Sequence, residues 1–214
     1  MDANNVQASS QVNVQRDAQA DKQRRVGRWK LFLIVGICAV PVLASYFTYY
    51  VIKPTGRTNY GDLIDPRNVP MPDLRALTLD GKAQSLDAYK GKWLLVQVDD
   101  GSCLATCQAK LLEMRQQRLM QGKEMDRIER VWLVTGDQAP NAQLLHDFDG
   151  MHVLHVDGNV VKTWLPVDGK DDSATDHIYV IDPVGNLMFR FPKNPDHAKM
   201  KKDIYKLLTA SSIG

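Results

Sequence analysis

The sequence predicts an α/β sandwich built on a central mixed sheet and preceded by one membrane-spanning helix. Two observations predict it. Residues 31–52 form a run of 22 residues without a charged side chain. Beyond that run, short apolar segments of strand length alternate with segments of helical periodicity. Their order is β-α-β, then α, then β-β-α, which is typical of helices packed against a mixed sheet.

Length and composition narrow the classes of protein that this chain can belong to. Its 214 residues suffice for one domain with additional segments, and a net charge of +2 gives no sign of a nucleic-acid partner. The first 30 residues hold six of the 27 basic residues and three of the 25 acidic residues. The rest of the chain therefore has 21 basic and 22 acidic residues, a net charge of −1. Three cysteines exclude a scaffold built from disulfides, and Cys38 lies within the apolar run.

The N-terminal part indicates a single-pass anchor. Residues 1–30 are expected to be a disordered cytoplasmic tail, since residues 1–23 are polar and have no aromatic side chain. Four basic residues, the last being Lys30, then precede residues 31–52. At about 1.5 Å per residue that run spans roughly 33 Å, enough to cross a hydrocarbon core of about 30 Å. A cleaved signal peptide is the alternative, but the run is long, starts late and lacks a clear cleavage site.

The basic cluster before the anchor also sets the expected topology. By the positive-inside rule the N-terminus is cytoplasmic and everything after Ile52 lies outside. We therefore expect a protein of the bacterial inner membrane with a periplasmic C-terminal domain, a compartment in which disulfides persist.

Residues 53–72 are rich in proline and glycine and are expected to be an extended linker without a core of its own. The folded domain is expected over residues 73–214. It opens with a short hairpin over residues 74–86 that turns at Asp80-Gly81.

The centre of the domain is a dense apolar run, 93–98, which predicts a buried strand. A turn at residues 99–102 follows. Leu104, Cys107, Leu111 and Met114 then recur at the spacing of one helix face, which predicts a helix over 104–121. The later elements follow from the same periodicities: strands at 131–135, 151–156, 177–181 and 187–191, helices at 141–148, 160–165 and 195–208, and a loop at 165–176.

Cys103 and Cys107 lie where the strand gives way to the helix. Unpaired N–H groups and partial positive charge at a helix N-terminus favour a thiolate, and residues i and i+4 share one face. The pair can form a disulfide or hold one metal ion together. Cys103 is expected to be the more exposed and nucleophilic sulfur, and Cys107 the more buried. A pair of buried apolar residues and a purely structural disulfide are the alternatives.

A strand that ends in a cysteine-containing turn, the Cys-x-x-x-Cys spacing, and Asp176-His177 at the start of the late hairpin together resemble the Sco/SenC family. The resemblance covers roughly residues 70–209. It implies a thioredoxin-like fold, membrane anchoring and a role in cytochrome c oxidase assembly. The chain differs from the family at two places. Gln108 stands where the family has proline, and the turn Asp99-Asp100-Gly101-Ser102 stands where the family usually has an aromatic-rich turn.

The resemblance also implies a site. Its catalytic residues would be Cys103 and Cys107, and its copper ligands Cys103, Cys107 and His177, holding Cu(I) or Cu(II). Thiolates suit soft Cu(I), and imidazole is an acceptable third ligand. The partner would be the copper-bearing subunit of cytochrome c oxidase or another copper chaperone. Two alternatives are a metal-free thiol–disulfide oxidoreductase that acts on a partner's cysteines and a non-catalytic assembly factor. The remaining histidines and methionines are interpreted as ordinary residues. The aspartates of 165–176 are interpreted as a solvated loop, with a docking surface or lid next to the site as the alternative.

Overall fold

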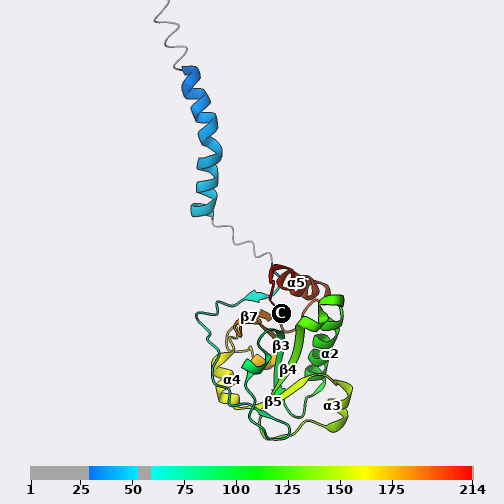
Figure 1. The fold of residues 1–214 in the computed structure, drawn as a ribbon. Coiled ribbons are helices and arrows are strands. Elements are labelled where there is room, and N and C mark those ends of the chain that lie inside the picture. Colours follow the sequence, from blue (N-terminus) through cyan, green and yellow to red (C-terminus); the bar gives the residue numbers. More distant parts are fainter. Residues whose placement is uncertain (1–28, 53–58, 214) are drawn as a thin grey trace, which may run out of the picture. The chain divides into compact units, whose positions relative to one another are not determined.

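The computed structural model describes residues 29–52 and 59–213. The chain divides into two compact units, Met1–Gly56 and Arg57–Gly214, each of which is described by itself. In the first unit, Trp29–Val51 is an apolar helix of 23 residues with a mean hydropathy of 2.2, long enough to cross a membrane (Figure 1). Its last residues, Thr48–Ile52, form a π-helical turn. Most of the expected N-terminal tail lies outside the described residues.

The second unit is built on one mixed sheet of seven strands in the order β1-β7-β6-β3-β4-β5-β2. The central strands β3, β4 and β5 are parallel, whereas β6 runs antiparallel to β3. This confirms the predicted mixed sheet. The strands are β1 (Asp62–Leu63), β2 (Leu77–Thr78), β3 (Trp93–Asp100), β4 (Ile128–Thr135), β5 (His152–Val156), β6 (Ile178–Ile181) and β7 (Leu187–Phe191).

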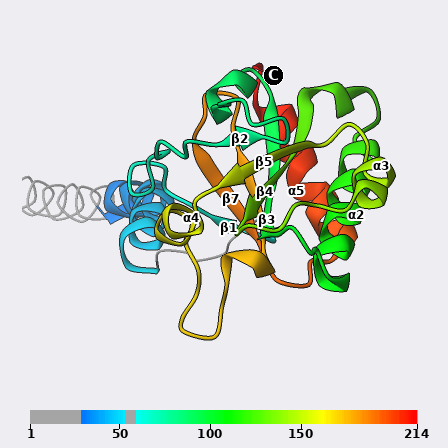
Figure 2. The same ribbon diagram turned by 90° about the horizontal axis from the view of Figure 1, so that it is seen from below.

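Helices cover both faces of the sheet. Figures 1 and 2 show α2, α3 and α5 on one face and α4 on the other. The buried clusters agree: Val161 and Trp164 of α4 pack with one side of β3, and Met114 and Ile204 pack on the opposite side. The helices are α2 (Ala105–Leu119), α3 (Ala142–Asp147), α4 (Gly158–Trp164) and α5 (His197–Ala210), with short 3-10 helices at Leu86–Tyr89, Gly122–Arg127 and Ala174–Asp176.

Local sequence explains where these elements begin and turn. The side chains of Asn141, Asp157 and Asp196 accept backbone N–H groups at the starts of α3, α4 and α5. The β6–β7 turn is held by Asp182, whose Oδ1 accepts from three successive backbone N–H groups, and Gly185 there has a φ of 107°. The predicted strands at 177–181 and 187–191 are thus joined by a tight turn into the expected hairpin.

Two expectations need correction. The segment before residue 73 was expected to contribute no core, but β1 pairs with β7 and Ile64 is buried. The folded unit thus begins earlier than residue 73. Strand β1 was not predicted because two residues are too short to give a periodic signal in the sequence. The early hairpin is reduced to β2, a bridge from Leu77 to Ala83 and the turn at Gly81, and β2 pairs with β5.

Candidate functional site

The cysteine pair lies where predicted, between the end of β3 and the first turn of α2. Cys103 and Cys107 form a disulfide, with their Cα atoms 5.1 Å apart. Leu104 is the N-cap residue of α2 and Ala105 its first residue, so only Cys107 belongs to the helix. Cys103 has a φ of 39°, in the left-handed region that residues with a Cβ rarely adopt. The chain therefore makes a strained turn at Cys103 to bring it over the helix start.

Both sulfur-bearing residues are buried. Cys103 and Cys107 are each 1% exposed, whereas Leu104 between them is 73% exposed. The expectation that Cys103 is the more exposed of the two is wrong for the disulfide form, as is the placement of Leu104 on the buried stripe. The cause is a cover that the sequence did not reveal: the pair packs in one cluster with Trp132 of β4 and Leu144 of α3.

The turn before Cys103 is fixed by polar contacts. Oδ1 of Asp100 accepts the backbone N–H groups of Ser102 (2.9 Å) and Cys103 (3.3 Å). A hydrogen bond from the Ser102 side chain, the largest contribution, lowers the pKa of Asp100. The Gln108 side chain donates to the Cys103 carbonyl (2.9 Å), and Gln97, fully buried in β3, donates to the Cys107 carbonyl (3.4 Å). Gln108 thus stabilises the strained turn.

A buried lysine lies one turn further along α2. Lys110 is 9% exposed, and its ammonium group donates to the Thr175 carbonyl just before β6. Burial lowers the pKa of Lys110, and the charges of Asp99 and Asp176 oppose this shift. Burial likewise raises the pKa of Asp99, against the influence of Lys110. The contact with Thr175 shows that the start of the late hairpin lies beside α2, as expected.

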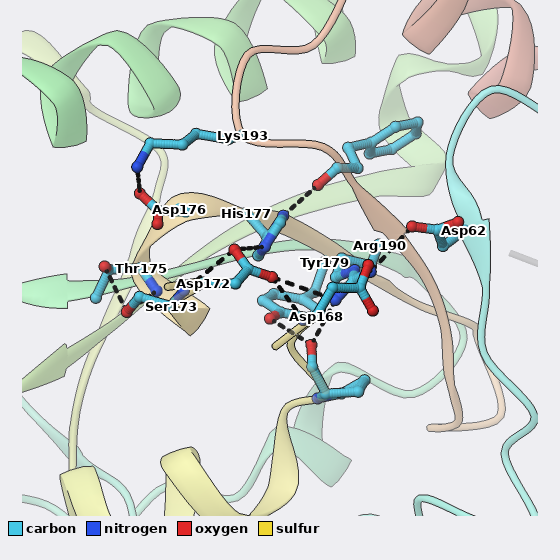
Figure 3. A network of polar contacts seen from close by, with 12 residues as sticks. Asp62, Asp168, Asp172, Ser173, Thr175, Asp176, His177, Tyr179, Arg190 and Lys193 are labelled. Carbon is cyan, nitrogen blue, oxygen red and sulfur yellow. Dashed lines mark hydrogen bonds and ion pairs between the residues drawn. The ribbon is translucent and has the colours of Figure 1, made fainter. Parts of the chain in front are cut away.

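His177 is at that end of the sheet, but its side chain has other partners. Nδ1 lies 2.8 Å from the Phe191 carbonyl, Nε2 lies 2.7 Å from Oδ1 of Asp172, and the residue is 5% exposed (Figure 3). A carbonyl and a carboxylate both accept hydrogen bonds. Each ring nitrogen therefore faces an oxygen acceptor, and the two contacts together fix the orientation of the ring.

Asp172 belongs to a larger cluster centred on Arg190, a charged residue within β7 whose side chain is 6% exposed (Figure 3). Arg190 forms ion pairs with Asp62 (3.0 Å), Asp168 and Asp172 (3.7 Å). Arg190 and the Tyr179 hydroxyl each donate to the Pro166 carbonyl at 3.1 Å. These contacts attach the 165–176 loop to the sheet. The interpretation of its aspartates as a solvated loop is therefore wrong for Asp172, which is 17% exposed.

The charges in this cluster perturb one another. Burial acts to raise the pKa of Asp172. Hydrogen bonds from the Asp168 backbone and from His177, together with the charges of His177 and Arg190, outweigh burial, so the pKa lies below its ordinary value. Burial also raises the pKa of Tyr179, which keeps its hydroxyl a donor.

Two of the three expected copper ligands, Cys103 and Cys107, lie together in the structure. Within residues 29–52 and 59–213, no three His, Cys, Asp or Glu side chains are grouped to hold a metal ion. The two sulfurs are joined to each other. Two thiolates at one helix start would suit Cu(I) after reduction, whereas His177 would have to give up one of its two hydrogen-bond acceptors to join them, because an imidazole ligates through one nitrogen.

Sequence reasoning missed Lys110, Gln97 and the Asp172–Arg190 pair. A signal existed for two of them. Lys110 follows Cys107 by three residues and so lies on the inward face of the predicted helix, and Arg190 interrupts an apolar strand. Nothing in the sequence distinguishes Asp172 from the other aspartates of its loop.

Two family models match the chain. The one describing a transmembrane-like, thioredoxin-like C-terminal domain covers residues 93–211, more than half of the chain. The chain belongs to this transmembrane-like, thioredoxin-like family. The second model, the transmembrane-like N-terminal domain, matches residues 20–51, in agreement with the apolar helix. The thioredoxin-like fold of the expected domain is thereby confirmed.

Solved structures similar to the thioredoxin-like unit include Sco proteins and thiol–disulfide oxidoreductases. A SCO1/SenC family lipoprotein from Bacillus anthracis has 17% identity and a TM-score of 0.49, over 66% of this chain and 96% of that one. Arabidopsis thaliana ScoI with copper bound has 14% identity and a TM-score of 0.48, over 71% and 99%. The thioredoxin domain of a Bacteroides vulgatus thiol-disulfide oxidoreductase has 16% identity and a TM-score of 0.45, over 63% and 94%. No curated protein sequence matches the chain.

Proposed function

We propose that this chain is a membrane-anchored thiol–disulfide exchange protein whose active pair is Cys103 and Cys107. The observation that supports the proposal is the disulfide between these residues at the start of α2. In the disulfide form, a thiolate of a partner attacks one sulfur and a mixed disulfide forms as the Cys103–Cys107 bond breaks. A second partner thiolate then completes the partner's disulfide, and the protein leaves as a dithiol. Two electrons and two protons pass to this chain; the reverse sequence reduces a partner's disulfide.

The surroundings of the pair support this chemistry. Unpaired N–H groups at the start of α2 stabilise a developing thiolate on either cysteine. The adjacent carboxylate of Asp100 is hydrogen-bonded to backbone N–H groups of the turn, which disperses part of its negative charge. Lys110 adds a positive charge one turn along the same helix. Because both cysteines are buried, a partner would have to displace part of the cover to which Leu144 of α3 contributes.

Copper delivery is the second candidate. It is favoured by the placement of two soft donors one helical turn apart, and by the resemblance to the Sco/SenC family. The reduced pair would hold one Cu(I), with His177 as a third ligand, and pass it to the copper-bearing subunit of cytochrome c oxidase or to another chaperone. Cu(I) is cargo in this scheme, so binding requires the dithiol and ends when the disulfide forms.

Localisation is part of the proposal. The chain would lie in the bacterial inner membrane with residues 1–30 in the cytoplasm and the thioredoxin-like unit in the periplasm, as the basic cluster before the apolar helix favours. A reporter that is active only outside the cytoplasm, fused after Gly214, should be active. Activity of a cytoplasm-only reporter at the same position would contradict the orientation.

One redox experiment separates the candidates. The full chain is equilibrated with glutathione or dithiothreitol buffers, and its dithiol fraction is measured by alkylation and mass spectrometry. A potential between about −120 and −270 mV supports exchange, whereas a value below about −300 mV supports a purely structural disulfide and a non-catalytic assembly factor.

Copper is tested on the reduced chain by competition with a chromogenic Cu(I) chelator. Delivery predicts one Cu(I) per chain, loss of binding in Cys103→Ser or Cys107→Ser, and weaker binding in His177→Ala. Equal binding by wild type and His177→Ala excludes His177 as a ligand. If the reduced wild type binds no Cu(I), copper delivery is excluded and thiol–disulfide exchange remains the proposed function.

A further inference from the structure

The exposed side of α5 carries an excess of positive charge. The helix holds four lysines and one aspartate, a balance of +3 with histidine neutral. Met200, Ile204 and Leu208 pack into the core, which turns the rest of the helix outward. Lys199, Lys201 and Lys202 are exposed, Lys206 is partly so, and Tyr205 among them is 57% exposed. We refer to these five residues as the lysine face.

The single acidic residue of α5 does not neutralise this face. The Asp203 side chain is 3% exposed, accepts the backbone N–H groups of Tyr60 (2.6 Å) and Gly61 (3.1 Å), and pairs with Lys206 (3.1 Å). Among the described residues, Lys199, Lys201 and Lys202 form no ion pair. Lys199 lies over the Tyr60 ring, 5.4 Å from its centroid, and its charge also acts on the Asp196 carboxylate at the start of α5. Three charges thus remain for a ligand outside the chain.

The contact with Tyr60 shows where the membrane-linked segment joins the folded unit. Asp203 holds the backbone of Tyr60 and Gly61, and the Tyr60 hydroxyl accepts the N–H of Asp196, the N-cap of α5 (2.8 Å). Tyr60 follows the end of the apolar helix, Ile52, by eight residues. Eight residues reach at most about 28 Å when fully extended. Chain connectivity therefore keeps α5 within reach of the membrane surface.

We propose that the lysine face binds the anionic phospholipid headgroups of the membrane that holds the anchor. Each ammonium gains by lying near a negatively charged lipid surface. Lysine stems can spread over the interface while their charges stay hydrated, and a tyrosine ring suits the headgroup depth. The tether maintains a high local concentration of lipid, so a face that is weak in isolation is occupied. This inference is independent of the chemistry at Cys103 and Cys107.

The test uses the full chain, one copy per nanodisc, in phosphatidylcholine alone or mixed with phosphatidylglycerol. Brief amine-reactive labelling is read by mass spectrometry at Lys199, Lys201 and Lys202, and at Lys162 and Lys170, which are exposed elsewhere on the unit. We expect labelling of the three α5 lysines to slow at least fivefold in the anionic discs, the factor that one lysine contributes. Lys162 and Lys170 should be unaffected. Salt of about 1 M, with a Debye length of about 3 Å, should remove the protection.

A matched pair of triple variants tests the face itself, with labelling of Lys206 as the readout. Lys199→Gln/Lys201→Gln/Lys202→Gln should abolish protection of Lys206 in anionic discs, and Lys82→Gln/Lys162→Gln/Lys170→Gln, with the same change in charge, should retain it. Equal labelling in both lipids overturns the proposal. Protection of the α5 lysines that persists in phosphatidylcholine alone also overturns it, because the contact would then not be with anionic lipid. Equal loss of Lys206 protection in the two triple variants overturns it as well, because net charge alone would then explain the binding.

Discussion

Replacing Arg190 by leucine should release the 165–176 loop and destabilise the folded unit. The guanidinium is 6% exposed and faces Asp62, Asp168 and Asp172, whose side chains are 38%, 81% and 17% exposed. Removing one member of a buried ion pair costs about 3–5 kcal/mol, because the remaining charge stays buried. Since water screens two of the three carboxylates, we expect the lower end, about 3 kcal/mol in the free energy of unfolding.

The measurement combines two readouts on the full chain in detergent. Urea unfolding followed by tryptophan fluorescence reports the free energy, and trypsin cleavage after Lys170, an exposed residue of the loop, reports its attachment. Cleavage should be faster in Arg190→Leu. Asp168→Asn is the matched control: it removes an ion pair of the same arginine from the solvent side and should cost less than about 1 kcal/mol. The reasoning is refuted if Arg190→Leu unfolds within about 0.5 kcal/mol of wild type and Lys170 is cleaved at an unchanged rate.

Three further outcomes are expected. The lowered pKa of Asp172 contributes stability that is complete above the ordinary value of 3.8 and is lost as the pH falls through the lower native value. The unfolding free energy of wild type should therefore fall more steeply below about pH 4 than that of Asp172→Asn, in a urea series across pH; parallel curves would contradict this. In Gly101→Ala the new Cβ would lie 1.8 Å from the Gln138 carbonyl oxygen, so we expect the free energy of unfolding, measured by thermal unfolding, to fall by about 2 kcal/mol. Gly158→Ala is the control and should change it little, because its Cβ would lie 3.5 Å from its nearest neighbour. Reducing the disulfide should cost about 2 kcal/mol by loop entropy, and a Cys103→Ser chain should show the same midpoint with and without reductant.

The elements of the sheet could be predicted because their signals are local. Strands at 93–98 and 131–135 and the helix after Cys107 all follow from apolar runs and helical spacing, and the structure places them within a few residues of prediction. Strand β1 could not be predicted, since its two residues acquire their role only by pairing with β7, far along the chain. The apolar helix Trp29–Val51 was predictable from its length and lack of charge.

The site was predictable in position but not in accessibility. A cysteine spacing at a strand–helix junction identified the pair, and the resemblance to the Sco/SenC family implied that His177 lies at the same end of the sheet. What covers the sulfurs depends on α3, and the packing of its Leu144 against the cysteine pair is a tertiary property. The orientation of the His177 ring depends on which loop aspartate reaches it, and several aspartates at similar spacing cannot be ranked from sequence.

The attachment of Tyr60 and Gly61 has a mechanical consequence. A pull transmitted along the chain from the membrane enters the folded unit at these residues, where Asp203 holds two backbone N–H groups and Asp62, two residues on, pairs with Arg190. The force is then shared between α5 and β7, at the edge of the sheet where β1 lies. Strand β3, which leads into the disulfide, is separated from that edge by β7 and β6. Lateral drag or tension on the anchor would thus strain the β1 edge before it reaches β3.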